Sequence, residues 1–213
     1  MSNPLNAARY LLSAHNTGQL PPDGGHEVAF AGRSNAGKSS ALNALAGHNA
    51  LARVSKTPGR TQQLVFFEVQ PGRCLVDLPG YGYAKVPQEL QAHWQAFIDR
   101  YFREREALKG LVVVMDIRHP LKDYDRQMLG YAVQRGLPAH ALLTKADKLG
   151  RGQQANALQA VRRELFSAYG DSVGVQTFSG ESKQGVEQAR AVVAGWLGLA
   201  QALPSSSRLS RDP

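Results

Sequence analysis

GRSNAGKS, residues 32–39, fits the phosphate-binding pattern G-x-x-x-x-G-K-S. The apolar run at 27–32 predicts a buried strand before it, and residues 38–47 predict a helix after it. Glycines at both ends let the backbone curl around phosphate oxygens, so that N–H groups and the helix N-terminus point at an anion. Lys38 adds a mobile positive charge, and the Ser39 hydroxyl suits magnesium. We therefore predict a strand–loop–helix unit that binds nucleotide phosphates; the alternative is a glycine-rich turn that matches by chance.

The rest of the chain alternates apolar strands with helical segments. This alternation is typical of an α/β fold with a largely parallel sheet covered on both faces. Two adjacent runs joined by Pro71-Gly72 indicate a hairpin, so we expect one edge strand to be antiparallel. The expected strands lie at about 27–32, 63–70, 73–78, 110–116, 139–144 and 173–179. The expected helices lie at about 38–47, 88–107, 122–136, 153–169 and 184–200.

The two ends of the chain differ from this pattern. Leu5, Ala8, Leu11 and Leu12 have helical spacing, which predicts a short amphipathic helix before a linker rich in proline and glycine. The last residues are polar and lack periodicity, which favours disorder. The expected organisation is an N-terminal helix and linker at 1–25, a single domain at 26–202 and a disordered tail at 203–213.

Composition narrows the classes of partner. The chain has 213 residues, of which 43% are hydrophobic and 20% charged, as in an ordinary globular protein. No apolar run is long enough to cross a bilayer and no secretory signal opens the chain, so we expect a cytoplasmic protein with no membrane partner. The formal net charge of +8 favours polyanions such as nucleic acid. The single cysteine, Cys74, lies in an apolar run and is expected to be a buried thiol.

A second motif indicates the base of the nucleotide. Thr144-Lys145-Ala146-Asp147 is a T-K-x-D form of the guanine-recognition motif at the end of the fifth expected strand. The Asp147 carboxylate can accept from both N1–H and the 2-amino group of guanine, whereas adenine offers neither donor there. The Lys145 stem can lie along the purine face. Thr144 occupies a position that asparagine fills more often.

Three further segments complete a GTPase pattern. Asp77-Leu78-Pro79-Gly80 fits D-x-x-G, in which the aspartate binds magnesium through water and the glycine N–H contacts the γ-phosphate. Thr61 is placed to complete the magnesium shell, and the loop Phe178-Ser179-Gly180 suits contact with the guanine carbonyl. The order of these motifs predicts a P-loop GTPase domain with a six-stranded, mostly parallel sheet. A metabolic ATP-dependent kinase explains only the phosphate loop, and Asp147 argues against it.

These motifs define the candidate site. The expected catalytic residues are Asn35, Lys38, Thr61 and Gly80. The expected magnesium ligands are Ser39, Thr61 and, through water, Asp77. The expected GTP- or GDP-binding residues are Gly32, Arg33, Ser34, Asn35, Ala36, Gly37, Lys38, Ser39, Ser40, Gly59, Arg60, Thr61, Gln62, Gln63, Asp77, Leu78, Pro79, Gly80, Thr144, Lys145, Ala146, Asp147, Phe178, Ser179 and Gly180.

The chain resembles the bacterial EngB (YihA or YsxC) family of ribosome-biogenesis GTPases from about residue 5 to 200. The resemblance rests on the motifs at 32–40, 56–62, 76–86, 116–120 and 143–149, and Thr144 agrees with the family pattern. It implies a GTPase that acts in late assembly of the large ribosomal subunit, with a link to normal cell division and septation. The implied partner is the large subunit or its precursor, with its RNA and proteins, and we expect a monomer.

Catalysis is where the chain departs from well-known small GTPases. Tyr81 follows Gly80, at a position where glutamine commonly orients the attacking water. We therefore expect slow hydrolysis that the ribosome accelerates; the alternative is a nucleotide-gated RNA- or ribosome-binding module with negligible turnover. Asn35 suggests one compensation, because the wider group that the chain resembles includes GTPases in which a phosphate-loop asparagine helps bind potassium near the transferring phosphate. The expected partner-reading residues in the flanking loops are Arg53, Lys56, Arg60, Tyr81, Tyr83 and Lys85.

Overall fold

Seven strands form one mixed sheet in the computed structural model, which describes residues 3–52, 63–80 and 88–199. Across the sheet the strand order is β1-β3-β4-β2-β5-β6-β7. The strands are β1 (Arg9–Ala14), β2 (His26–Gly32), β3 (Leu64–Gln70), β4 (Arg73–Asp77), β5 (Leu108–Asp116), β6 (Ala139–Thr144) and β7 (Val173–Thr177). The expected disordered tail, at 203–213, lies outside the described residues.

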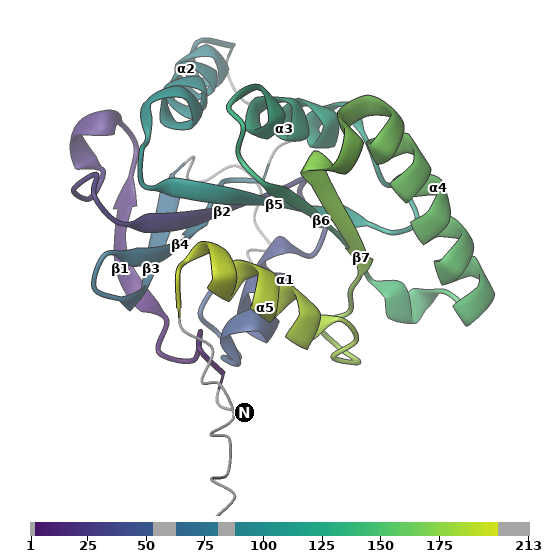
Figure 1. The fold of residues 1–213 in the computed structure, drawn as a ribbon. Coiled ribbons are helices and arrows are strands. Elements are labelled where there is room, and N and C mark those ends of the chain that lie inside the picture. The colour runs from purple at the N-terminus through teal and green to yellow at the C-terminus, as the bar shows by residue number, and fades with distance from the viewer. Residues whose placement is uncertain (1–2, 53–62, 81–87, 200–213) are drawn as a thin grey trace, which may run out of the picture.

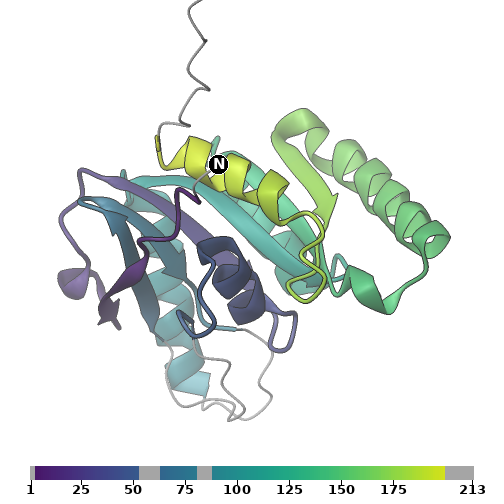
Figure 2. The same ribbon diagram turned by 90° about the horizontal axis from the view of Figure 1, so that it is seen from below.

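Helices cover both faces of the sheet, as the alternating pattern predicted. Figure 1 shows α2, α3 and α4 on one face and α1 and α5 on the other. Figure 2, seen from below, shows α5 and α1 lying across the second face. The helices in the described ranges are α1 (Lys38–Ala46), α2 (Gln88–Glu104), α3 (Asp123–Gln134), α4 (Arg151–Tyr169) and α5 (Val186–Trp196). None of these helices is long and apolar enough to span a membrane.

The N-terminal segment corrects one prediction. Residues 9–14 form β1, whereas the spacing of Leu5, Ala8, Leu11 and Leu12 predicted a helix. β1 pairs antiparallel with β3, with Arg9 opposite Glu68 and Ala14 opposite Leu64. The unpaired backbone edge of β3 offers a ladder of hydrogen bonds that no local pattern reveals. The sheet therefore has seven described strands rather than the six expected.

The direction of the strands follows the prediction except at the edge. β3 is antiparallel to both β1 and β4, so the expected antiparallel strand exists but lies second from the edge. β4, β2, β5, β6 and β7 are mutually parallel along the sheet. Their carboxyl ends consequently meet at one edge, where open α/β sheets bind ligands.

The core lies on both faces of the central strands. All six residues of β6 are buried, as expected for a parallel strand covered by helices on both sides. On α2 the described aromatic stripe is buried as predicted, with Trp94 3% and Tyr101 1% exposed. Cys74 is also buried, as predicted, and burial raises the pKa of its thiol to about 12.

A buried charged cluster fixes the start of β2, the strand that leads to the phosphate loop. The Glu27 carboxylate, in a residue that is 3% exposed, accepts hydrogen bonds from the Tyr101 hydroxyl at 2.8 Å and the Arg105 Nε at 3.1 Å. Paired donors of this kind offset the cost of burying a charge. The cluster therefore ties the end of α2 to β2.

Candidate functional site

The phosphate loop joins β2 to α1 at the carboxyl edge of the sheet, as the sequence predicted. Gly37 caps α1 with φ of 93°, in the left-handed region that glycine adopts readily. A Cβ on Gly32 would lie 2.8 Å from the Val114 carbonyl oxygen, so β2 and β5 approach too closely there for a larger residue. The N-terminus of α1 thus faces the loop, as phosphate binding requires.

The D-x-x-G segment lies beside the phosphate loop. The Lys38 Nζ forms an ion pair with the Asp77 carboxylate, and the two side chains are 10% and 17% exposed. The Leu78 amide donates to the Phe30 carbonyl at 3.0 Å, which continues the β2–β4 pairing past the end of β4. A Cβ on Gly80 would lie 3.4 Å from the Ser34 amide nitrogen, which places Gly80 in contact with the loop backbone. The fold thus brings together two motifs whose paired residues, Lys38 and Asp77, are 39 positions apart in the sequence.

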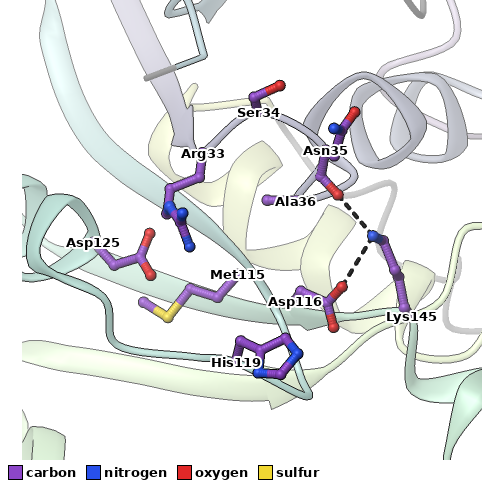
Figure 3. Close-up of a pocket in the computed structure, with 9 residues that line it drawn as sticks. All are labelled: Arg33, Ser34, Asn35, Ala36, Met115, Asp116, His119, Asp125 and Lys145. Carbon is purple, nitrogen blue, oxygen red and sulfur yellow. Dashed lines mark hydrogen bonds and ion pairs between the residues drawn. The ribbon is translucent and has the colours of Figure 1, made fainter. Parts of the chain in front are cut away.

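The T-K-x-D segment also contacts the phosphate loop, through hydrogen bonds to its backbone carbonyls. The Lys145 Nζ donates to the Asn35 carbonyl at 2.7 Å and lies 2.9 Å from the Asp116 Oδ2, as Figure 3 shows. The Thr144 hydroxyl is buried and lies within hydrogen-bond distance of the Ala36 and Met115 carbonyls. A hydroxyl has one proton to donate, so these two carbonyls share it. Thr144 therefore links the loop to β5 and β6 with a side chain shorter than asparagine.

Asp147 is held ready to accept hydrogen bonds. Its Oδ1 accepts from the Ser179 hydroxyl at 2.6 Å, and its Oδ2 lies 3.0 Å from the Lys148 Nζ. The Ser179 hydrogen bond, followed by that of Lys148, lowers the pKa of Asp147, so the carboxylate stays ionised at neutral pH. The Ala146 amide donates to the Phe178 carbonyl at 3.1 Å. The two predicted guanine-contacting loops therefore form one unit.

The loop after β7 also reaches the phosphate side of the site. A Cβ on Gly180 would lie 3.2 Å from the Ser40 carbonyl oxygen, so this loop packs on the first turn of α1. The Ser179 hydroxyl accepts from the amides of Glu181 and Ser182 at 3.2 and 3.1 Å. These bonds orient its own proton toward Asp147, and the loop geometry thus depends on Ser179.

Asp116 is a functional candidate that the motif assignment missed. It ends β5 and pairs with Lys145, while the Arg118 Nε and Nη2 donate to it at 2.9 and 2.6 Å. The Arg118 hydrogen bonds, together with those of Lys145, hold the pKa of Asp116 well below its usual range. The signal was present in the sequence, because Asp116 follows a buried strand whose carboxyl end belongs to the site edge.

A cavity of about 170 Å³ lies behind the phosphate loop, between the end of β5 and the start of α3. Figure 3 shows Arg33, Asp116, His119 and Asp125 around it. Asp125 is 2% exposed, and its Oδ2 accepts from the Lys122 amide at 3.0 Å. Its Oδ1 has no hydrogen-bond partner among the described residues, and burial raises the pKa of this carboxyl to about 6. Sequence reasoning did not single out Asp125.

Several predicted site residues lie away from this site or outside the described residues. Gln63 directly precedes β3, and its side-chain amide hydrogen-bonds the His15 ring. The predicted nucleotide, magnesium and partner-reading residues that lie outside the described residues are Arg53, Lys56, Gly59, Arg60, Thr61, Gln62, Tyr81, Tyr83 and Lys85.

The described donors suit magnesium. Ser39 supplies a hydroxyl in the first turn of α1, and Asp77 supplies a carboxylate held at the same place by Lys38. Both are hard oxygen donors, and magnesium commonly takes one or two such protein ligands beside phosphate oxygens and water. These residues would hold the ion at the phosphate end of the site.

Comparison with known proteins gives consistent matches. A family model described as a 50S ribosome-binding GTPase matches residues 27–145. A relative from Xanthomonas axonopodis pv. citri, described as a probable GTP-binding protein EngB, is 77% identical over 206 residues, 97% of this chain and 96% of the relative. A relative of the same description from Stenotrophomonas maltophilia is 79% identical over 199 residues, 93% of this chain and 100% of the relative.

A solved structure supports the fold independently of sequence. The crystal structure of a probable GTP-binding protein engB matches with a TM-score of 0.63 at 19% identity, over 82% of this chain and 100% of that one. At this identity the match shows the fold alone. Together with the family match, it confirms the predicted P-loop GTPase fold.

Proposed function

The chain belongs to the EngB family of GTP-binding proteins, with a ribosome-binding GTPase domain, and on that premise we propose that it is a GTP-hydrolysing switch for late assembly of the large ribosomal subunit. In this proposal it acts as a cytoplasmic monomer. Its partner is the large subunit or a precursor of it. The link to cell division and septation that the family resemblance implies is part of the same proposal.

One observation carries the proposal: Lys145 connects the base end of the site to the phosphate end. Its Nζ bonds the Asn35 carbonyl in the phosphate loop, and Asp147, the guanine acceptor, lies two residues further along the chain. A nucleotide that spans both ends would therefore contact one connected unit. Guanine specificity follows from Asp147, because a site built around its carboxylate leaves that group unpaired when adenine enters.

The residues at the phosphate end supply charge stabilisation. The Lys38 Nζ and the loop N–H groups would contact the outer phosphates, where negative charge accumulates during phosphoryl transfer. Magnesium, when bound, would neutralise charge on the β- and γ-phosphates. Gly80 lies beside the loop backbone near Ser34. In this proposal its N–H contacts the γ-phosphate, and loss of that contact on hydrolysis provides the switch.

The rate of hydrolysis separates this proposal from its alternative. Tyr81 cannot offer the paired amide geometry of glutamine, so turnover by the isolated protein is slow. A nucleotide-gated module with negligible turnover has the same binding residues. Single-turnover GTP hydrolysis with and without purified large subunits tests the difference. Acceleration by the subunits supports the proposed switch, and an unchanged negligible rate would favour the gated module.

The ribosomal partner is tested by co-sedimentation with large-subunit precursors. Binding with a non-hydrolysable GTP analogue is expected to exceed binding with GDP, because the γ-phosphate would hold the loops that contain Thr61 and Gly80. A basic protein on RNA should also bind less as salt rises. Equal sedimentation in both nucleotides would count against a switch. Competition of GTP with ATP is the specificity control, and a preference for ATP would overturn guanine recognition.

A further inference from the structure

The outer face of α4 carries an exposed aromatic ring one turn after two arginines. Phe166 is 60% exposed, a large exposure for an apolar side chain of this size. Arg162 and Arg163 precede it by four and three residues and are both exposed. Residues at these spacings are neighbours on a helix surface. The three side chains therefore form one patch, which we call the α4 patch.

The α4 patch has an unbalanced positive charge. Neither Arg162 nor Arg163 forms an ion pair within the described residues. The carboxylate in this turn, Glu164, is directed elsewhere, because it pairs with Arg126 of α3. The opposite side of the helix is buried through Val161 and Leu165. Both guanidinium groups are consequently available to an anionic partner.

We infer that the α4 patch binds single-stranded RNA, with the arginines on phosphates and Phe166 stacked on an unpaired base. Arginines beside an exposed aromatic ring match both parts of a nucleotide, since bases stack on phenyl rings and guanidinium groups pair with phosphate. A stable protein interface buries about 800 Å² on each partner around a more apolar centre. The exposed positions of α4 one and two turns before the patch, including Ala155 and Gln159, supply no large apolar side chain.

The location of the α4 patch makes this contact separate from the nucleotide site. α4 packs against β7, and Figure 1 shows it at the side of the sheet opposite β1. Gln154, in the first turn, donates to the Ala146 and Leu149 carbonyls beside the guanine-binding loop, whereas the patch lies near the other end of the helix. RNA should therefore bind equally in GDP and GTP. The choice of RNA as the partner rests on the proposed ribosomal role. The choice of the α4 patch as a binding site rests only on its own residues.

The test uses the full chain and a short fluorescein-labelled single-stranded RNA, with a duplex of the same length for comparison. Phe166→Ala is expected to weaken single-strand binding roughly 5-fold or more, because each stacked base contributes about 1–3 kcal/mol. Phe166→Tyr should restore binding, and the duplex, whose bases are already stacked, should show a smaller loss. Arg162→Gln/Arg163→Gln should make the slope of log affinity against log salt shallower by about 1.4, or about 0.7 for each phosphate contact.

A charge-matched control removes two arginines from α2 instead. Arg100→Gln/Arg103→Gln lowers the net charge equally and should leave RNA affinity and its salt slope near wild-type values. The inference is overturned if both arginine pairs weaken binding equally, or if Phe166→Ala leaves RNA affinity unchanged. It is also overturned if Phe166→Ala reduces only binding to whole subunits, which would indicate a protein partner.

The same variants test RNA binding by the α4 patch separately from the proposed GTP switch. All of them should retain wild-type GTP and GDP affinity, since they lie outside the nucleotide site, and thermal unfolding checks that they fold. Loss of nucleotide-dependent subunit binding in the wild-type protein, with RNA binding intact, would overturn the proposed switch alone.

Discussion

Lys145 and Asp116 form an ion pair with 2.9 Å between Nζ and Oδ2, and this pair joins the end of β5 to the segment that follows β6. The same Nζ donates to the Asn35 carbonyl in the phosphate loop. Because the lysine has three donors and Asp116 is held ionised, both contacts fix the direction of the Lys145 side chain. If Lys145 contacts the nucleotide as proposed, nucleotide binding should also depend on Asp116.

Asp116→Asn is expected to weaken GTP and GDP binding about 10-fold, because the hydrogen bond to Lys145 loses its charge. Calorimetric titration of both nucleotides measures this effect. The matched control is Arg118→Gln, which removes the other partner of Asp116, a side chain that is 44% exposed. A loss with Arg118→Gln as large as that with Asp116→Asn would show that Asp116 does not act through Lys145.

Asp147→Asn is expected to change the preferred base of the nucleotide from guanine to xanthine. The amide can no longer accept two donors from guanine, so GTP affinity should fall about 100-fold or more. Xanthine has a carbonyl in place of the 2-amino group, and the new amide N–H₂ can donate to it. Competition between the two triphosphates measures the change. Ser179→Ala, which removes the hydroxyl that holds Asp147, should weaken GTP binding less and keep guanine preferred; a gain for xanthine in that variant would contradict our assignment.

Potassium is expected to accelerate GTP hydrolysis roughly 10-fold relative to sodium, through electrostatic stabilisation that depends on Asn35. Asn35 has φ of 63°, its carbonyl accepts from Lys145, and Figure 3 shows its side-chain amide directed away from that lysine. Asn35→Gly removes the amide and tolerates this backbone conformation, so it should abolish the difference between the two salts. Equal wild-type turnover in both salts would exclude this role.

Asp125→Asn is expected to stabilise the protein increasingly as pH rises from about 4 to 6. Burial raises the pKa of Asp125 from its ordinary value of 3.8 to about 6. In this interval the folded protein therefore binds more protons than the unfolded chain, and wild-type stability falls with rising pH. The gain at pH 7 relative to pH 4 should reach at most about 3 kcal/mol, from 1.36 kcal/mol for each pKa unit. Denaturant unfolding across pH measures it, and parallel profiles of the two proteins would contradict it.

The sequence predicted the strand, loop and helix around residues 32–39 because that arrangement is local. A phosphate loop needs its strand, glycines and helix within one short segment, and the structure confirms that arrangement around Gly37. The order of strands and helices from β2 to α5 was predicted for the same reason, since the hydrophobic period changes within each segment. Most observed element boundaries lie within a few residues of the expected ones.

What was missed depends on contacts between distant segments. Asp125 lines the cavity where β5, α3 and the phosphate loop converge, and no spacing within the chain predicts that convergence. Asp116, at the end of a buried strand, could have been found from the sequence. The N-terminal strand was predicted as a helix because Leu5, Ala8 and Leu12 have helical spacing, but Leu5 and Ala8 precede the strand and only Leu12 lies in it. Backbone pairing with β3 decided the outcome, and it places Arg9 opposite Glu68, 59 residues away in the chain.

β1 is the first strand in the chain and the outermost strand of the sheet. Its only neighbour among the described strands, β3, begins at Leu64, so a growing chain must carry β1 without a partner until that segment has been synthesised. Closing the loop between β1 and β3 costs entropy before any pairing compensates for it, whereas β3 and β4 are adjacent in the chain. The N-terminal strand should therefore add to the free edge of β3 only after the β3–β4 hairpin has formed.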